Sequence, residues 1–445
     1  MSTRFQFFTA SIIIGLLLGA GPLQAEETDP NAPATQLPDP VTASDLIVHA
    51  YDANPDIASA RAGWRAAVEQ YRVATGYPDP QLMVTYFPEP IETRLGPQDW
   101  NAVLSQMIPF PGKLARAGEV AAADAEMARV KLDMAVRNLA VDIRESFHEL
   151  AYIRTAKQIA GEELDLVNHL RKVSETAYAD DRANLNDVVR AQSQIGQLRY
   201  DRILLDELEA TEIARLNELL NRSPDAAIGE LADPPIQPPI YTIQEINDMA
   251  ASYRDEIRMA RLAEEKSTAK RELTRYDNLP DFKVGVFYAG VGNPNVPMPP
   301  DDAGRDAVGI QFGVSVPLWL GKNRGQAARE EARLEMARAD TTARINETRT
   351  RIREVYFRLQ NARRLIDLYG NELIPQAMNS MGLAETWFRE KEASFADAVE
   401  AQSVLYNFRL SMARARADYG KYLARLERLV GRSLTQPAEK EALER

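Results

Sequence analysis

The chain has 445 residues, with 53 lysines and arginines against 65 aspartates and glutamates, a formal net charge of −12, and no cysteine. The acidic balance argues against a nucleic-acid-binding protein. The lack of cysteine excludes disulfides and thiolate metal sites, and we expect no lipid anchor, since that attachment needs an N-terminal cysteine.

The first 25 residues predict a cleaved secretory signal peptide, because Arg4 precedes a short apolar run at 12–18 and the small residue Ala25 stands at the end. The alternative is a membrane anchor helix, for which the apolar run is short. Residues 26–41 contain four prolines and predict a disordered N-terminal segment. Beyond them, no stretch approaches the ~18 continuous apolar residues of a membrane-spanning helix. Contact of the mature protein with a bilayer would therefore have to use strands.

The first half of the mature chain, residues 42–222, predicts a simple order of elements. They are a helix at 42–75, strands at about 80–88 and 100–108, a long helix at 113–178 and a return helix at 184–221. The two long helices form a predicted hairpin over 113–221. The first of them lacks proline and carries apolar residues every three or four positions, so it would be on the order of 100 Å long.

The second half, residues 242–431, repeats this order after a proline-rich linker at 223–241. We expect a helix at 242–276, strands at about 281–291 and 307–317, a helical hairpin over 322–431 and a charged tail at 432–445. Local sequences of the two halves match at offsets of about 200 to 210 positions, which indicates an internal duplication. The predicted fold class is therefore mainly α with a small β part, built from a duplicated helix–strand–strand–long helix–helix unit.

The predicted strands alternate between apolar and small or polar residues. In the last strand, Val308, Ile310, Phe312 and Val314 alternate with Gly309, Gln311 and Gly313. This pattern is typical of a strand with lipid on one side and water on the other, although a half-buried sheet with one wet face remains the alternative. Four strands are too few to close a barrel, so we expect several chains to contribute strands to one.

The ordered set of elements resembles the TolC family of bacterial outer-membrane efflux channels. The resemblance covers residues 42–431 and rests on two local signatures. One is the corner between strand and helix, with Pro109 and Gly112 in the first half and Pro317 and Gly321 in the second. There the prolines would end the strands and the glycines would relax the backbone. The other is the hairpin tip, represented by Tyr178, Asp181, Leu185, Phe388, Lys391 and Phe395.

The resemblance implies a homotrimer in the outer membrane, with a 12-stranded transmembrane β-barrel made by three chains and a long coiled-coil tunnel of helices in the periplasm. The hairpin tips would dock a periplasmic adaptor protein, which links the channel to an inner-membrane pump, expected to be a proton-driven pump of the resistance-nodulation-division type. Asp181 and Lys391 replace the family's tip glycines, which puts the docking contacts in question.

The resemblance also places acidic residues just beyond the second tip at the constriction of the tunnel. Here they are Asp397 and Glu400, which share a helix face, and three chains would present rings of carboxylates that favour cations. The alternative is that both are ordinary surface acids. The first-half equivalents, Asp187 and Arg190, are expected to pair with neighbouring helices and hold the entrance shut.

The cargo is the least determined part of this prediction. The corner around Phe110 and the preceding residues 77–80 look most like the heavy-metal branch of the family, with drugs or other organic compounds and polypeptides as the alternatives. The spacing Glu145-x-x-His148 occurs in di-iron bundles, but the second half has Phe357 where a second histidine would be needed. We expect no metal site, no cofactor and no catalytic activity. A periplasmic scaffold without a pore is the competing function, but it leaves the amphipathic strands unexplained.

Overall fold

The computed structural model describes residues 37–179, 185–390 and 395–435. The predicted signal peptide and most of the segment 26–41 lie outside these residues. Residues 37–41 are described: Val41 is buried and forms a parallel bridge with Leu231 in the linker. The described part of the chain thus begins slightly before the expected start at residue 42.

Each half opens with two short helices, where the sequence predicted one. In the first half they are α1 (Ala43–Ala53) and α2 (Pro55–Thr75), and in the second α5 (Ile243–Tyr253) and α6 (Asp255–Asp277). The first break has a local cause, because the Asn54 side chain caps α2 and Pro55 occupies its first turn. The second break, at Arg254, lacks both devices and depends on tertiary contacts described below.

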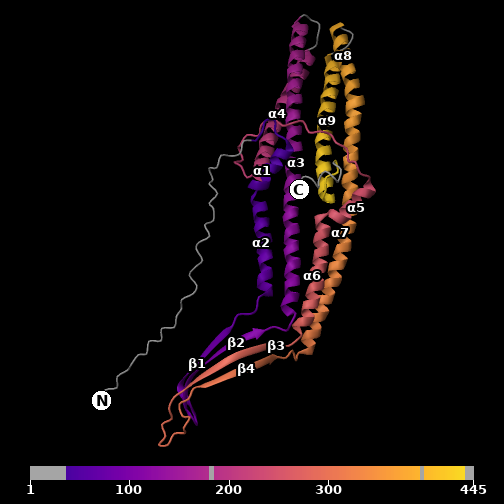
Figure 1. Cartoon of the computed structure of the whole chain (residues 1–445). Coiled ribbons are helices and arrows are strands. Elements are labelled where there is room, and N and C mark those ends of the chain that lie inside the picture. Colours follow the sequence, from indigo (N-terminus) through magenta and orange to yellow (C-terminus); the bar gives the residue numbers. More distant parts are fainter. Residues whose placement is uncertain (1–36, 180–184, 391–394, 436–445) are drawn as a thin grey trace, which may run out of the picture. The chain divides into compact units, whose positions relative to one another are not determined.

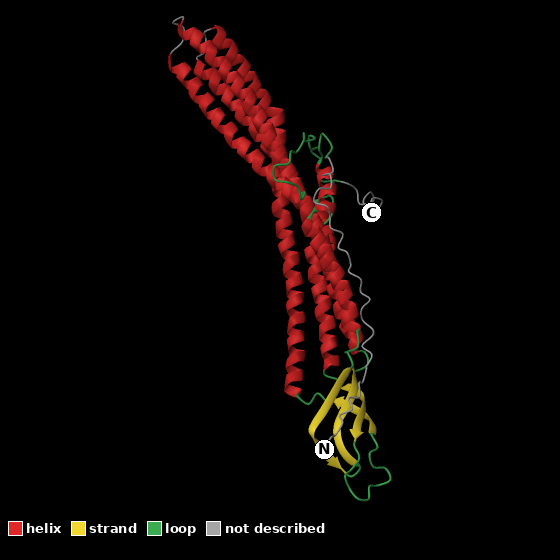
Figure 2. Cartoon of the chain, turned by 90° about the vertical axis from the view of Figure 1, so that its left-hand side faces the viewer, coloured by secondary structure: helices red, strands yellow, loops and turns green. Residues whose placement is uncertain are grey.

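Four strands form one antiparallel sheet in the order β1-β2-β3-β4. Their bounds are β1 (Gln81–Thr93), β2 (Gly96–Ile108), β3 (Asp281–Val291) and β4 (Ala307–Ser315). Each half contributes one hairpin, and β2 of the first half pairs with β3 of the second. Figure 2 shows that the sheet lies beyond the ends of the helices to which it is connected.

The long helices follow the strands in both halves (Figure 1). The first hairpin consists of α3 (Lys113–Ala179) and α4 (Leu185–Leu219). The second consists of α7 (Leu320–Leu368), a π-helical turn η1 (Tyr369–Leu373), α8 (Ile374–Glu390) and α9 (Phe395–Val430). No helix among the described residues is both long and apolar enough to cross a membrane.

The two halves bury matching positions in two separate cores. In the first core, Ile143 and Leu150 of α3 pack with Leu46 and Leu216, and in the second their counterparts do the same. The counterparts are Ile352, Leu359, Ile246 and Leu426. Full burial of one such side chain stabilises the fold by about 1.5–3 kcal/mol. The duplication is therefore present in the packing as well as in the sequence.

The π-helical turn marks a one-residue insertion in the second half. Before it, buried positions of α3 and α7 match at an offset of 209, as for Ile143 and Ile352. After it they match at 210, as for Val167 and Ala377. A π-turn is how a continuous helix accommodates one extra residue. The turn ends two residues before Pro375, whose ring would meet the carbonyl of residue 371 in a regular α-helix.

Candidate functional site

The strand register places most of the large apolar side chains of the four strands on one face of the sheet, although Met83, Val103 and Phe287 lie on the other. Val84 of β1 lies opposite Ala102, Leu104 of β2 opposite Val286, and Val286 of β3 opposite Ile310. The members of this apolar face are Leu82, Val84, Tyr86, Trp100, Ala102, Leu104, Ile108, Phe282, Val284, Val286, Tyr288, Val308, Ile310, Phe312 and Val314. Most of the large ones are more than half exposed, for example Phe312 at 80%. An exposed apolar surface of this extent indicates a contact with lipid or protein.

The opposite face is small and polar toward its β4 edge. Gly285 of β3 lies opposite Gln311, and Lys283 lies opposite Gly313. Within the described residues, β1 and β4 each pair with a strand on one side only. Their outer edges therefore present unpaired backbone N–H and C=O groups, which lipid cannot satisfy.

The first corner between strand and helix is tightly constrained. Gly112 has φ +90°, and a Cβ there would lie 2.9 Å from the ring of Tyr276. Asp281 of the second half accepts a hydrogen bond from the backbone N–H of Phe110 at 3.0 Å and pairs with Lys113 at 2.9 Å. Pro109 follows the last residue of β2, as predicted for a residue that ends a strand.

The second corner differs from the first in its glycine. Pro317 lies between β4 and α7, but Gly321 is already the second residue of α7, has no left-handed φ and has open space around its Cβ position. The expectation that Gly321 relaxes the backbone is therefore wrong. Helix α7 begins three positions after Pro317, whereas α3 begins four positions after Pro109. Gly321 stands four positions after its proline and Gly112 three, so Gly321 falls inside the helix.

The predicted entrance residues lie at the far ends of the helical hairpins. Asp187 and Arg190 belong to the first turns of α4, and Asp397 and Glu400 to the first turns of α9. Asp397, Glu400 and Arg190 are exposed. Asp397 also borders a groove between α8 and α9, whose other lining residues include Gln376, Asn379, Ser380, Leu383 and Trp387.

The predicted docking residues are only partly described. Tyr178 near the end of α3 and Leu185 at the start of α4 are both exposed. Phe388 lies in α8 and Phe395 begins α9, but their side chains are outside the described part of the structure, as are Asp181 and Lys391 entirely.

A series of polar contacts joins α3 of the first half to α9 of the second. Glu145 accepts two hydrogen bonds from Arg425, at 2.7 and 2.6 Å. One turn along, Glu149 contacts both Arg414 and Lys421. Further toward the tips, buried Glu163 accepts a hydrogen bond from Gln402, and burial raises the pKa of its carboxyl despite that contact. Because Glu145 is committed to Arg425, it is not available as a metal ligand.

His148 lies within this series and is held neutral. Burial, together with the nearby charges of Lys421 and Arg144, lowers its pKa to about 4. Its Nδ1 is buried and has no hydrogen-bond partner among the residues that the structure describes. The described residues contain no cluster of three or more potential metal ligands. The histidine is therefore a packing residue between α3 and α9.

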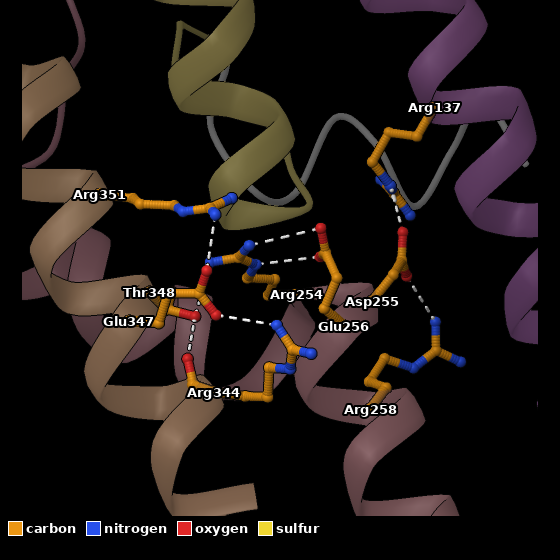
Figure 3. Close-up of polar contacts among 9 residues, drawn as sticks. All are labelled: Arg137, Arg254, Asp255, Glu256, Arg258, Arg344, Glu347, Thr348 and Arg351. Atoms are coloured by element: carbon orange, nitrogen blue, oxygen red, sulfur yellow. Dashed lines mark hydrogen bonds and ion pairs between the residues drawn. The ribbon is translucent and has the colours of Figure 1, made fainter. Parts of the chain in front are cut away.

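A second group of polar contacts joins the two halves at the break between α5 and α6 (Figure 3). The Arg254 guanidinium donates to Thr348 Oγ1 at 2.6 Å and pairs with Glu256. Arg137 of α3 reaches across from the first half, donating to Asp255 Oδ2 at 2.7 Å and to the Gly431 carbonyl at 2.6 Å. Arg254 and Asp255 are almost completely buried, so these contacts determine where α6 begins.

The sequence did not single out Arg137 or Arg254. The only available signal was the comparison of Asn54 with Arg254 at equivalent positions. Asn54 can cap a helix by itself, whereas a long cationic side chain such as Arg254 cannot. This difference indicates that the second break needs a partner distant in sequence, but it does not identify that partner.

Comparisons with known proteins agree with this architecture. Residues 247–432 match the model of the family described as Outer membrane efflux protein. No curated protein sequence matches the chain. Among solved structures, the outer membrane protein VceC from Vibrio cholerae is 18% identical with a TM-score of 0.73, over 88% of this chain and 96% of that chain.

Two further solved structures have the same fold. CusC, whose crystal structures concern folding and transmembrane channel formation, is 15% identical with a TM-score of 0.74, over 88% of this chain and 92% of that one. The CmeC outer membrane channel of Campylobacter jejuni is 11% identical with a TM-score of 0.70, over 90% and 88%. The predicted fold class, mainly helical with a small sheet, is confirmed.

Proposed function

We propose that the chain, of which residues 247–432 match the outer membrane efflux protein family, belongs to that family. It would then be one subunit of a trimeric outer-membrane channel that conducts its cargo passively. The observation that carries this proposal is the four-stranded sheet, with its apolar side chains on one face and two open edges. Three such sheets joined edge to edge would satisfy every backbone group and turn the apolar face toward lipid.

The helices are then the periplasmic part of the channel. Outer membrane efflux channels work with an adaptor and an inner-membrane pump, and we place the adaptor at the hairpin tips near Tyr178 and Leu185, which are exposed. We further propose that the pump is proton-driven and of the resistance-nodulation-division type. Export would use the N-terminal signal peptide, cleaved near Ala25, and no lipid anchor.

Asp397 and Glu400 are proposed to face the lumen at the entrance. Both are exposed and lie three residues apart on α9, so three chains would supply six carboxylates around one axis. Such a ring favours cations over anions. Metal cations are the proposed cargo, with drugs or other organic compounds and polypeptides as the alternatives. We propose that Asp187 and Arg190 hold the entrance closed by pairing with neighbouring helices.

The experiment is single-channel recording of the purified protein in a planar bilayer. We expect cation-selective channels, and a clear loss of selectivity in an Asp397→Asn, Glu400→Gln double variant. The matched control is Glu218→Gln with Asp225→Asn, which removes two exposed charges far from the entrance. Absence of any channel, with the protein recovered from the aqueous periplasmic fraction, would contradict the channel itself. Channels with unchanged selectivity would contradict only the role of the two acids.

A further inference from the structure

We propose that a second copy of the chain packs against α7 and β4 in the same register in which the second half packs against the first within one chain. In this register Glu354 pairs with Arg215 of the partner subunit, and Phe312 lies opposite Val84 of the partner subunit. The inference rests on the proposed trimer and adds to it which residues meet. It follows from the internal duplication, because three chains with two equivalent halves have six similar junctions, three of which are visible inside the chains.

Equivalent positions can be assigned from burial and backbone geometry. Between α3 and α7 the offset is 209 before the π-turn, as for Leu150 and Leu359, which are both fully or almost fully buried. Between α4 and α9 the offset is 210, as for Leu216 and Leu426. The same offset relates Asn221 and Gly431, which follow these helices and are both in the left-handed backbone region.

We call the contact between the two halves of one chain the internal junction, and the contact proposed between neighbouring chains the outer junction. Positions that are buried at the internal junction have equivalents at the outer junction that are exposed in a single chain. Leu273 of α6, a helix that packs against α3 of the first half, is 7% exposed, whereas its equivalent in α2, Val73, is 70% exposed. Ala413 of α9 is 9% exposed, whereas its equivalent in α4, Ile203, is 65% exposed. The first half therefore presents apolar side chains at the positions that the second half uses to contact its neighbour.

The other side of the outer junction is α7. Val141 of α3 is buried at the internal junction, and its equivalent in α7, Thr350, is exposed. The most specific feature is an ion pair. At the internal junction Glu145 of α3 pairs with Arg425 of α9 through two hydrogen bonds. The equivalents are Glu354 on α7 and Arg215 on α4, a glutamate and an arginine again. Both are exposed in one chain, where Glu354 pairs with Arg358 of its own helix.

The strands lead to the same junction. At the internal junction Leu104 of β2 lies opposite Val286 of β3. The equivalent of Leu104 is Phe312, by the offset of 208 that relates Pro109 to Pro317. The equivalent of Val286 is Val84, by the offset of 202 that relates Pro78 to Pro280. Carrying the register over puts Phe312 opposite Val84 of the partner subunit, and their apolar side chains share one face.

The test uses the absence of cysteine from the native chain. A Phe312→Cys, Val84→Cys double variant in outer membranes should form disulfides between chains on oxidation, since directly opposed residues of paired strands have Cα atoms within disulfide range. Non-reducing gels should show covalent dimers and trimers. Leu104→Cys with Val286→Cys is the matched control, and it should form the same bond within one chain.

Two register controls make the result decisive. Phe312→Cys is combined with Leu82→Cys or with Tyr86→Cys, which lie on the same face two positions away. We expect at least fivefold more cross-linked product from the Val84 pair than from either shifted pair. A larger yield from a shifted pair, in a protein that is trimeric and conducts ions, would overturn the register and leave the proposed channel intact. A protein that is monomeric in membranes would overturn the proposed channel as well.

Charge reversal tests the helical part independently. Glu354→Arg and Arg215→Glu should each lower the temperature at which the trimer dissociates on a detergent gel, and the double variant should restore most of the loss. Additive losses in the double variant would show that the two residues do not meet. The disulfide experiment in the strands uses different variants and a different measurement. Poor folding of a charge-reversal variant therefore does not affect the disulfide result.

Discussion

Gly420 of α9 lies directly against the imidazole of His148 in α3. A Cβ at position 420 would come within 2.2 Å of both His148 Cε1 and Nε2. The glycine is thus present for close approach and not for backbone freedom, since it lies in the interior of a helix. The two halves of the chain are packed here without room for one additional methyl group.

The first prediction is that Gly420→Ala destabilises the protein by about 1–3 kcal/mol, because the new methyl group must displace the imidazole or separate the helices. The measurement is the midpoint of thermal unfolding followed by circular dichroism in detergent. Gly382→Ala in α8 is the matched control, because its Cβ would meet nothing within 4 Å, and alanine in a helix interior is favoured over glycine by about 0.5–1 kcal/mol. A loss of stability in the control equal to that in Gly420→Ala would contradict the packing explanation.

The second prediction concerns the pH dependence of stability. His148 has a pKa of about 4 in the folded chain and 6.5 as its ordinary value. Between these values the unfolded chain binds a proton that the folded chain does not, so stability should fall as the pH drops from about 6.5 to 4, by on the order of 2–3 kcal/mol. The contribution of the histidine to the pH dependence should vanish about one pH unit above 6.5, where the unfolded imidazole is also neutral.

The measurement is the unfolding midpoint between pH 7.5 and 4.5 for the native chain and for His148→Gln. Burial raises the pKa values of Glu163, Asp142 and Asp418, and their protonation at low pH acts in the opposite direction. The informative quantity is therefore the difference between the two proteins. Parallel pH profiles would contradict the neutral, buried state of the imidazole.

The third prediction follows from the π-turn. Deletion of Asn371 together with Pro375→Ala should convert η1 into regular α-helix and leave α8 in its native register, because the first half is continuous there and one residue shorter. The proline must be replaced, since without the wide turn its ring clashes at a cost of about 3 kcal/mol. Recovery of trimer from outer membranes is the measurement.

A deletion elsewhere in the same helix provides the comparison. Removal of Arg349, an exposed residue of α7, would rotate all following positions by about 100° around the helix axis and expose the core. We expect folded trimer from the first deletion and none from the second. Equal yields, high or low, would mean that the π-turn is not a one-residue insertion.

Much of the fold could be predicted from the sequence, because its signals are local and occur twice. The alternation of Val308, Ile310, Phe312 and Val314 identified the strand and its apolar face, and Pro109 and Gly112 identified the first corner. The side-by-side order of the two hairpins could not be read in this way. It depends on the pairing of Leu104 with Val286 across the halves, and no local pattern encodes that contact.

The deviations from the predictions have physical causes of the same kind. Gly321 looked equivalent to Gly112, but it stands one position further from its proline, and α7 begins one position nearer to that proline than α3 does. It therefore lies inside a helix, where its neighbours set the backbone conformation. The helix break at Arg254 depends on Thr348, 94 positions away. The roles of Asp397 and Glu400 depend on other copies of the chain, so they stay predictions.

The open edges of β1 and β4 have a consequence for biogenesis. In the proposed channel, a newly exported copy that has not yet met its partners would expose two rows of unpaired backbone groups beside an apolar surface, the combination that promotes fibrous aggregation. We therefore expect transit through the aqueous compartment to require a holdase chaperone, and its depletion to convert the chain into insoluble, protease-sensitive material before it reaches the lipid.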